Sequence, residues 1–169
     1  MMFYIREATE DDVQGWATVQ VRSWQSAYRN IMPDDFLSSL SVEKNAEGFL
    51  KAFETYKGAS FYFVAVKDEQ IIGNLVLSKC RDEDKPSAGE IIAIYLLEEY
   101  WDMGYGRLML EHSINTLKQK GFKEILIWVL EENHRARTFY EKFGFVLDGS
   151  TKEVEIGKRL VEVMYSLNE

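Results

Sequence analysis

A glycine turn in the middle of the chain has the residue types that bind an anion through the backbone. The apolar run from Ile91 to Leu97 is rich in strand-forming residues and leads to Gly104–Gly106, after which apolar residues recur at helical spacing. Glycine lets a backbone approach a ligand closely, and the N–H groups and dipole of a helix N-terminus favour negative charge. This strand, turn and helix therefore predict a phosphate-binding site.

Two common nucleotide-binding motifs do not fit this turn. The P-loop pattern requires a final Gly-Lys-Ser/Thr, which the chain lacks. The dinucleotide fingerprint needs a glycine or alanine three residues after the second glycine, where this chain has Met109. The turn also follows several predicted strands rather than the first, so both nucleotide interpretations are poor.

Periodicity, caps and turn residues predict the elements that position the turn. Helices are expected after the capping residue Thr9, after Pro33, after Ser41, from Tyr105 and from Asn133. Strands are expected over 3–6, 60–67, 71–78, 90–97, 124–130, 145–156 and 160–167. The unit spanning 90–130 should be a right-handed parallel crossover, and the flanking hairpins should be antiparallel. The predicted class is α/β (α+β), a mixed, mostly antiparallel twisted sheet of about seven strands with a central parallel pair and helices on both faces.

Composition restricts the class of protein. A chain of 169 residues is long enough for one domain with a buried core, so we expect a single domain over 1–169. The net charge of −8 disfavours non-specific binding to nucleic acid, and it either favours small cationic partners or only aids solubility. No apolar stretch is long enough to span a membrane, and the acidic N-terminus lacks a secretory pattern, so a cytoplasmic protein is expected. Cys80 is the single cysteine, which leaves no internal disulfide, and no metal site is predicted.

Two motifs together resemble the GNAT superfamily of N-acetyltransferases. In that family an apolar strand leads to Arg/Gln-X-X-Gly-X-Gly/Ala, and here the corresponding segment is Trp101–Gly106. The segment Asn133–Tyr140, followed by Gly144 and Phe145, is similar to the family's Asn-X-X-Ala-X-X-Phe-Tyr-X-X-X-Gly-Phe. The order of elements resembles the family over essentially the whole chain, which implies the GNAT fold.

The resemblance implies acetyl-CoA as co-substrate, with its pyrophosphate held by the amides of the glycine turn. Trp101 stands where the family usually has Arg or Gln, and Arg107 is a candidate for the missing positive charge. The family uses a bulged strand whose freed N–H polarises the thioester, a role expected here of the backbone at Leu96 and Leu97. The cofactor-binding residues implied are Tyr95, Leu96, Leu97, Trp101, Asp102, Met103, Gly104, Tyr105, Gly106, Arg107, Leu108, Asn133, Ala136 and Tyr140.

Two residues are the catalytic candidates. Expulsion of a thiolate requires a proton donor, and the resemblance places the phenol of Tyr140 near the CoA sulfur, a role we favour over simple packing beside Phe139. An ammonium must lose a proton before it attacks, and Glu90, at the start of the central strand, is either the base for this step or a solvated carboxylate. Asn133 can cap its helix and contact the cofactor together. Cys80 has no evident base, so direct transfer without an acyl-enzyme is expected.

The acceptor is expected to be a primary amine of a small molecule or a peptide. Trp24 and Tyr28, on one face of the first long helix, are the acceptor-binding candidates, although core packing is an alternative for both. Ribosomal-protein acetyltransferases of the family carry a glutamate at the position of Trp128, which argues against that subgroup. Homodimers are common in the family, so one is possible here. The alternative function, suggested by Trp101, is a non-catalytic acyl-CoA-binding sensor.

Overall fold

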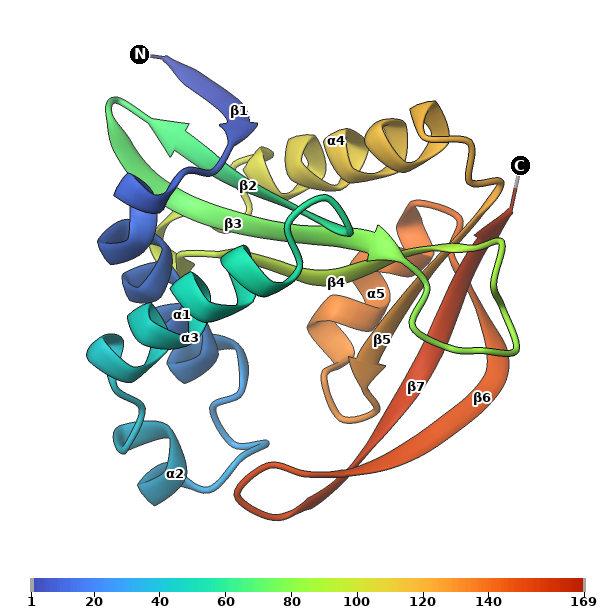
Figure 1. The fold of residues 1–169 in the computed structure, drawn as a ribbon. Helices are drawn as coiled ribbons and strands as arrows, with labels where there is room; N and C mark the ends of the chain where they lie inside the picture. Colours follow the sequence, from blue (N-terminus) through green and yellow to red (C-terminus); the bar gives the residue numbers. More distant parts are fainter. Residues whose placement is uncertain (1, 169) are drawn as a thin grey trace.

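The computed structural model describes residues 2–168, so the expected domain, 1–169, extends one residue beyond the described chain at each end. One mixed sheet has the strand order β1-β2-β3-β4-β5-β7-β6 (Figure 1). The strands are β1 (Phe3–Glu7), β2 (Ser60–Lys67), β3 (Gln70–Lys79), β4 (Gly89–Leu96), β5 (Glu124–Leu130), β6 (Val146–Glu155) and β7 (Arg159–Asn168). The predicted fold class, including its seven strands, is confirmed.

Helices cover both faces of this sheet. On one face α1 and α3 pack across β2, β3 and β4, and α4 lies on the other face with α5 (Figure 1). The helices are η1 (Glu10–Asp12), α1 (Val13–Ala27), α2 (Asp34–Ser38), α3 (Val42–Thr55), η2 (Glu98–Tyr100), α4 (Tyr105–Gln119) and α5 (His134–Lys142). None of the described helices combines the length and hydropathy that crossing a bilayer requires.

Side-chain caps explain where several helices begin. The Ser41 hydroxyl accepts a hydrogen bond from the Lys44 N–H at 3.2 Å, and the Asn133 side chain accepts one from the Ala136 N–H at 3.2 Å. At the first helix, Asp12 accepts the Thr9 N–H at 2.8 Å, the return half of a capping box. The predicted helix starts at these caps are therefore confirmed.

The central parallel pair separates soon after it forms. β4 and β5 are paired only at Gly89 with Ile125 and at Glu90 with Leu126. Just beyond, Ile92 has no partner on β3, because the register shifts there by one residue, and such a bulge bends the strand that carries it. β4 then remains with β3, and β5 remains with β7, so the two strands diverge (Figure 1).

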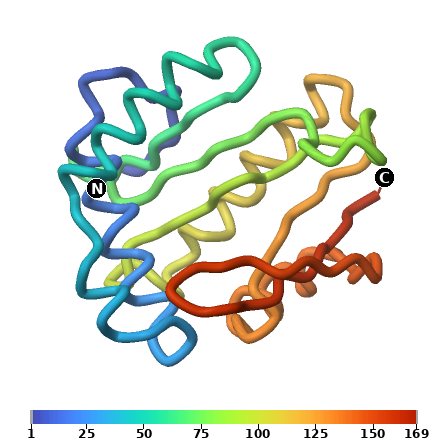
Figure 2. The backbone as a smooth tube through the Cα atoms, turned by 60° about the horizontal axis from the view of Figure 1, so that its bottom comes forward, coloured from blue at the N-terminus to red at the C-terminus, as the bar shows by residue number. Residues whose placement is uncertain are grey.

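The hairpin of β6 and β7 closes the molecule beside the end of the first helix. Its turn packs on the segment around α2, where a Cβ on Gly157 would lie 2.8 Å from Cγ of Phe36. The tube in Figure 2 shows this hairpin passing close to the segment that joins α1 to α2. The N-terminal helices and the C-terminal hairpin thus border the same end of the gap between β4 and β5.

Candidate functional site

A cleft of about 730 Å³ lies where β4 and β5 diverge. Its walls are the facing strand segments 92–96 and 127–130, and its mouth is formed by the first turns of α4 and α5. Ser23 and Ala27 of α1, together with the C-cap residue Tyr28, close the other end. The hydrogen bonds that would join the two strands are missing here, so main-chain polar groups of both strands face the cleft.

The glycine turn forms the mouth at the start of α4. Gly104 is the N-cap residue with φ of +90°, a left-handed conformation that glycine adopts without strain. No side chain caps this helix, and no atom among the described residues lies within 4 Å of where a Cβ on Gly104 would be. The first N–H groups of α4 are therefore available to a ligand.

The guanidinium of Arg135 on α5 lies over Trp101, the residue that stands where the family motif has Arg or Gln. The Arg135 Cζ is 4.4 Å from the centroid of the Trp101 ring, and its Nη2 is 2.9 Å from Oδ1 of Asp102. The Trp101 indole N–H donates to the Leu96 carbonyl at 2.9 Å, which fixes the ring against the end of β4. All three of these side chains line the cleft, so a positive charge is held beside the glycine turn.

Tyr140 projects from α5 into the same cleft. It is buried with 7% of its surface exposed, and its ring packs at 6.0 Å from that of Phe145 and 6.4 Å from that of Tyr165. Burial raises the pKa of Tyr140, and the nearby Tyr95 adds to the rise. The phenol therefore keeps its proton at neutral pH.

A pair of phenols continues the wall toward α1. The hydroxyls of Tyr28 and Tyr95 are 3.3 Å apart, and burial raises the pKa of both groups. Trp24 packs edge-on against Tyr28 at 5.1 Å but does not line the cleft. Of the two predicted acceptor-binding residues, the structure therefore brings Tyr28 to the cleft and leaves Trp24 behind it.

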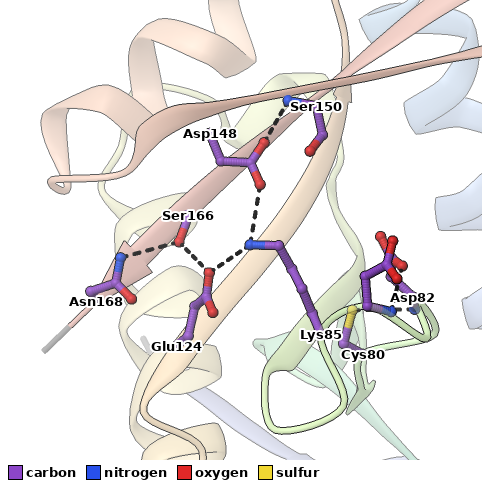
Figure 3. A network of polar contacts seen from close by, with 9 residues as sticks. Cys80, Asp82, Lys85, Glu124, Asp148, Ser150, Ser166 and Asn168 are labelled. Carbon is purple, nitrogen blue, oxygen red and sulfur yellow. Dashed lines mark hydrogen bonds and ion pairs between the residues drawn. The ribbon is translucent and has the colours of Figure 1, made fainter.

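Glu90 is buried beneath an arginine. Its side chain is 2% exposed, and its Oε2 is 2.8 Å from Nε of Arg81, which lines the cleft whereas Glu90 does not. The loop that follows Arg81 is tied to the sheet by Lys85, whose ammonium is 2.9 Å from Glu124 and 3.2 Å from Asp148 (Figure 3). Any reaction of Glu90 with a group in the cleft must therefore pass Arg81.

Cys80 lies beside this loop. It is buried, and burial raises the pKa of its thiol, so the thiolate is disfavoured (Figure 3). This environment is that of a packing residue rather than a nucleophile.

The predicted position of the bulge in the central strand is wrong. The bulge lies at Ile92, near the last parallel pair, and not at Leu96 and Leu97. The Leu97 N–H donates to the Ile72 carbonyl at 2.9 Å, and the Leu97 side chain is 1% exposed, so neither its amide nor its side chain is free for a ligand. Sequence could not locate the bulge, because it depends on the register between β3 and β4.

The other predicted cofactor residues separate into two groups. The cleft is lined by Tyr95, Leu96, Trp101, Asp102, Gly104, Gly106, Arg107, Asn133, Ala136 and Tyr140. Outside its lining lie Leu97, Met103, Tyr105 and Leu108. Tyr105 packs on Phe3 at 4.8 Å, whereas Met103 and Leu108 are exposed. Arg107 is 71% exposed and paired with Glu111 at 2.8 Å.

Sequence reasoning missed four charged residues of the cleft, Arg81, Lys142, Arg135 and Glu162. Arg135 stands inside the second family motif, where its place in the first turn of a helix beside the glycine turn was a usable signal. Glu162 interrupts the apolar pattern of the last strand, and an unexpected carboxylate in a half-buried strand was the signal there.

A second cavity of about 780 Å³ meets this cleft at Arg81, Ile92 and Ala93. It lies between α1, α3 and β3, and its lining includes the side chains of Lys44 and Lys79. The bulge at Ile92 of β4 thus borders both hollows.

Comparisons with known proteins agree with this geometry. Residues 18–145 match the family described as Acetyltransferase (GNAT) family. The uncharacterized N-acetyltransferase YuaI of Bacillus subtilis is 38% identical over 134 residues, covering 78% of this chain and 74% of YuaI. The spermidine N(1)-acetyltransferase of Thermoplasma acidophilum is 24% identical over 151 residues, covering 88% of this chain and 91% of that protein.

A solved structure shows the same fold. The PaiA N-acetyltransferase from Thermoplasma acidophilum, in complex with coenzyme A, superposes with a TM-score of 0.78 at 21% identity and full coverage of both chains. The chain therefore belongs to the GNAT acetyltransferase family, and it is an acyltransferase.

Proposed function

We propose that this protein transfers an acetyl group from acetyl-CoA directly to a primary amine within a ternary complex. The observation that carries the proposal is the divergence of β4 and β5, with the glycine turn at the mouth of the resulting cleft and Tyr140 in its wall. Acetyl-CoA supplies the acetyl thioester. The free amine attacks the thioester carbonyl carbon, a carbon–nitrogen bond forms, and the carbon–sulfur bond breaks.

The residues at the mouth fit a diphosphate. The amides at the start of α4 have no side-chain cap, the space at Gly104 is open, and Arg135 adds a positive charge. Arg135 thus replaces the cation that the family motif carries at the position of Trp101. The open edges of β4 and β5 offer main-chain partners to the amides of the pantetheine arm.

The reaction requires three proton transfers. The acceptor ammonium first loses a proton, either to Glu90 through water that passes Arg81 or directly to water. Tyr140, which keeps its proton at neutral pH, donates it to the leaving thiolate, and the nitrogen loses its second proton as the amide forms, which restores the phenol. Ile92, which lines the cleft without a partner on β3, is the candidate main-chain donor to the thioester oxygen.

The acceptor is a small amine or a peptide amine. Relatives differ in this respect: one is named for spermidine, and the [ribosomal protein bS18]-alanine N-acetyltransferase of Haemophilus influenzae is 34% identical over 93 residues, 55% of this chain. Trp128 in place of the glutamate of the ribosomal subgroup supports a small molecule. The sensor alternative depends on the missing cation at position 101, and Arg135, which places a cation beside Trp101, supports the transferase instead.

The test is thiol release from acetyl-CoA in the presence of an amine panel. Tyr140→Phe should lower kcat about a hundredfold or more, the range for loss of a general acid, while the Kd for CoA stays within about twofold. Tyr4→Phe, an exposed tyrosine on β1, is the matched control and should change neither value. Full turnover by Tyr140→Phe near neutral pH would remove Tyr140 from the mechanism.

A further inference from the structure

One carboxylate in the cleft is not used by the proposed chemistry. Glu162 lies on β7 between Leu130 of β5 and Lys152 of β6, and it lines the cleft near the end closed by α1. Its side chain is 20% exposed, so it is largely withdrawn from solvent. A carboxylate in such a place is costly unless a positive group pairs with it.

The protein's own ammonium occupies this position. Lys152 Nζ is 3.4 Å from Oε2 of Glu162 and 4.2 Å from the centroid of the Trp128 ring. A carboxylate beside an aromatic face is a site for an organic cation, because the ring quadrupole and the negative charge both attract it. Lys152 is 41% exposed, so its ammonium can move into water with little loss of interaction energy.

The neighbouring wall also has an unused polar group. Ser23 lines the cleft with only 1% of its surface exposed, and its hydroxyl has no hydrogen-bond partner among the described residues. A buried hydroxyl without a partner is unfavourable, and a ligand bearing N–H groups would satisfy it. Together with the phenols of Tyr28 and Tyr95, this end of the cleft suits a compact amine.

The cation site is separate from the position of the reacting amine. Tyr140 packs against Tyr165 of β7, with the ring centroids 6.4 Å apart. Glu162 is three residues from Tyr165 on the same strand, so its side chain lies on the opposite face of the sheet from Tyr165. A cationic group of the acceptor that binds at Glu162 therefore keeps its charge, while a different nitrogen of the acceptor is acetylated.

Resting on the proposed acetyl transfer, we propose that Glu162 and Trp128 hold a second, non-reacting cationic group of the acceptor, which displaces Lys152. The preferred acceptors are then small aliphatic diamines and longer polyamines. An amine that carries a carboxylate at its far end would face repulsion from Glu162.

Three substrates with the same reacting amine and different far ends provide the test: 1,4-diaminobutane, butylamine and 4-aminobutanoate. We expect kcat/KM to fall in that order. Glu162→Gln should lower the ratio of kcat/KM for 1,4-diaminobutane over butylamine about tenfold, the loss expected for one hydrogen-bonded charge pair that is largely withdrawn from solvent. Glu153→Gln, which removes an exposed carboxylate of β6 that is paired with Arg159, is the matched control and should keep the ratio.

A binding measurement separates this inference from the proposed function. Calorimetry with 1,4-diaminobutane and the protein saturated with CoA involves no acetyl transfer. We expect Lys152→Met to tighten this binding several-fold, because it removes the competing ammonium, and Glu162→Gln to weaken it about tenfold.

The outcomes are distinct. Acetylation of butylamine with no preference for the diamine, or a preference for 4-aminobutanoate, would overturn the cation site and leave the transferase function standing. Diamine binding that depends on Glu162, without acetylation of any amine, would support the site and refute the transfer. Unchanged diamine binding in Glu162→Gln would overturn the inference.

Discussion

Replacing Arg135 tests whether this guanidinium performs the phosphate-binding role that Trp101 cannot. In Arg135→Gln the backbone amides of the glycine turn remain, whereas the charge, the stacking on Trp101 and the ion pair with Asp102 are lost. The amide side chain keeps similar length and polarity, which limits disturbance of α5.

The expected loss of binding free energy for CoA follows from how far the Arg135 side chain is exposed to solvent. Opposite unit charges about 4 Å apart attract by about 4 kcal/mol at an effective dielectric constant of 20 and by about 1 kcal/mol in water. The Arg135 side chain is 54% exposed, so the lower end applies. A loss of about 1 kcal/mol corresponds to an increase of about fivefold in the Kd for CoA.

The assay is calorimetric binding of CoA at low ionic strength, with pantetheine as a ligand that lacks the phosphates. Arg135→Gln should weaken CoA and leave pantetheine unchanged, and the effect should shrink as salt rises. Adding Trp101→Arg to Arg135→Gln should restore CoA binding to within about twofold, because the cation returns at the position where the family carries it. Arg159→Gln removes an exposed charge elsewhere and should have no effect.

Two results would refute this reasoning. One is a Kd for CoA that stays within about twofold of the original in Arg135→Gln at low salt. The other is an equal loss of affinity for pantetheine, which would indicate a general disturbance of the cleft rather than a lost phosphate contact.

Three further predictions concern single residues. If Glu90 is the base, Glu90→Gln should shift the pH optimum of turnover upward, since the amine must then lose its proton to water. Glu153→Gln, which removes an exposed carboxylate outside the cleft, should not shift it. An unchanged profile in Glu90→Gln removes Glu90 from the mechanism. The Arg6 guanidinium holds the pKa of Asp12 below its usual value of 3.8, so this pair stabilises the fold above about pH 4 and is lost as pH falls through the lowered pKa. Asp12→Asn should therefore lower the free energy of chemical unfolding by about 2 kcal/mol at pH 7, a value that allows for the exposed arginine. This loss should shrink toward zero in acid. A loss that does not depend on pH would contradict the prediction. Gly104→Ala places a side chain at φ of +90°, so it should lower the free energy of unfolding by about 1 kcal/mol and weaken the binding of CoA. Thermal unfolding with and without CoA measures both effects. No change in either quantity would contradict this prediction.

Much of the fold was predictable because its signals are local. The bounds of β2 and β5 agree with prediction, since apolar runs between turn residues define them. The caps at Ser41 and Asn133 depend on contacts only three residues long, and Gly104 and Gly121 adopt the positive φ that helix boundaries require. The glycine turn and its helix were therefore placed correctly before any tertiary contact was known.

The details of the site were not predictable, because they depend on contacts between distant segments. Arg135 reaches Trp101 across 34 positions only because α5 packs beside the start of α4. The burial of Glu90 under Arg81 requires a loop fixed to β5 and β6 by Lys85.

The sequence by itself determined the family, the glycine turn and the tyrosine that lines the cleft, since each follows from residues close together in the chain. The tertiary structure alone decided where β4 bends, which cation lies at the mouth of the cleft, and that Glu162 and Trp128 share one ammonium. The physical reason is that strand register and helix packing, which bring these groups together, are sums of many weak long-range contacts that no short segment encodes.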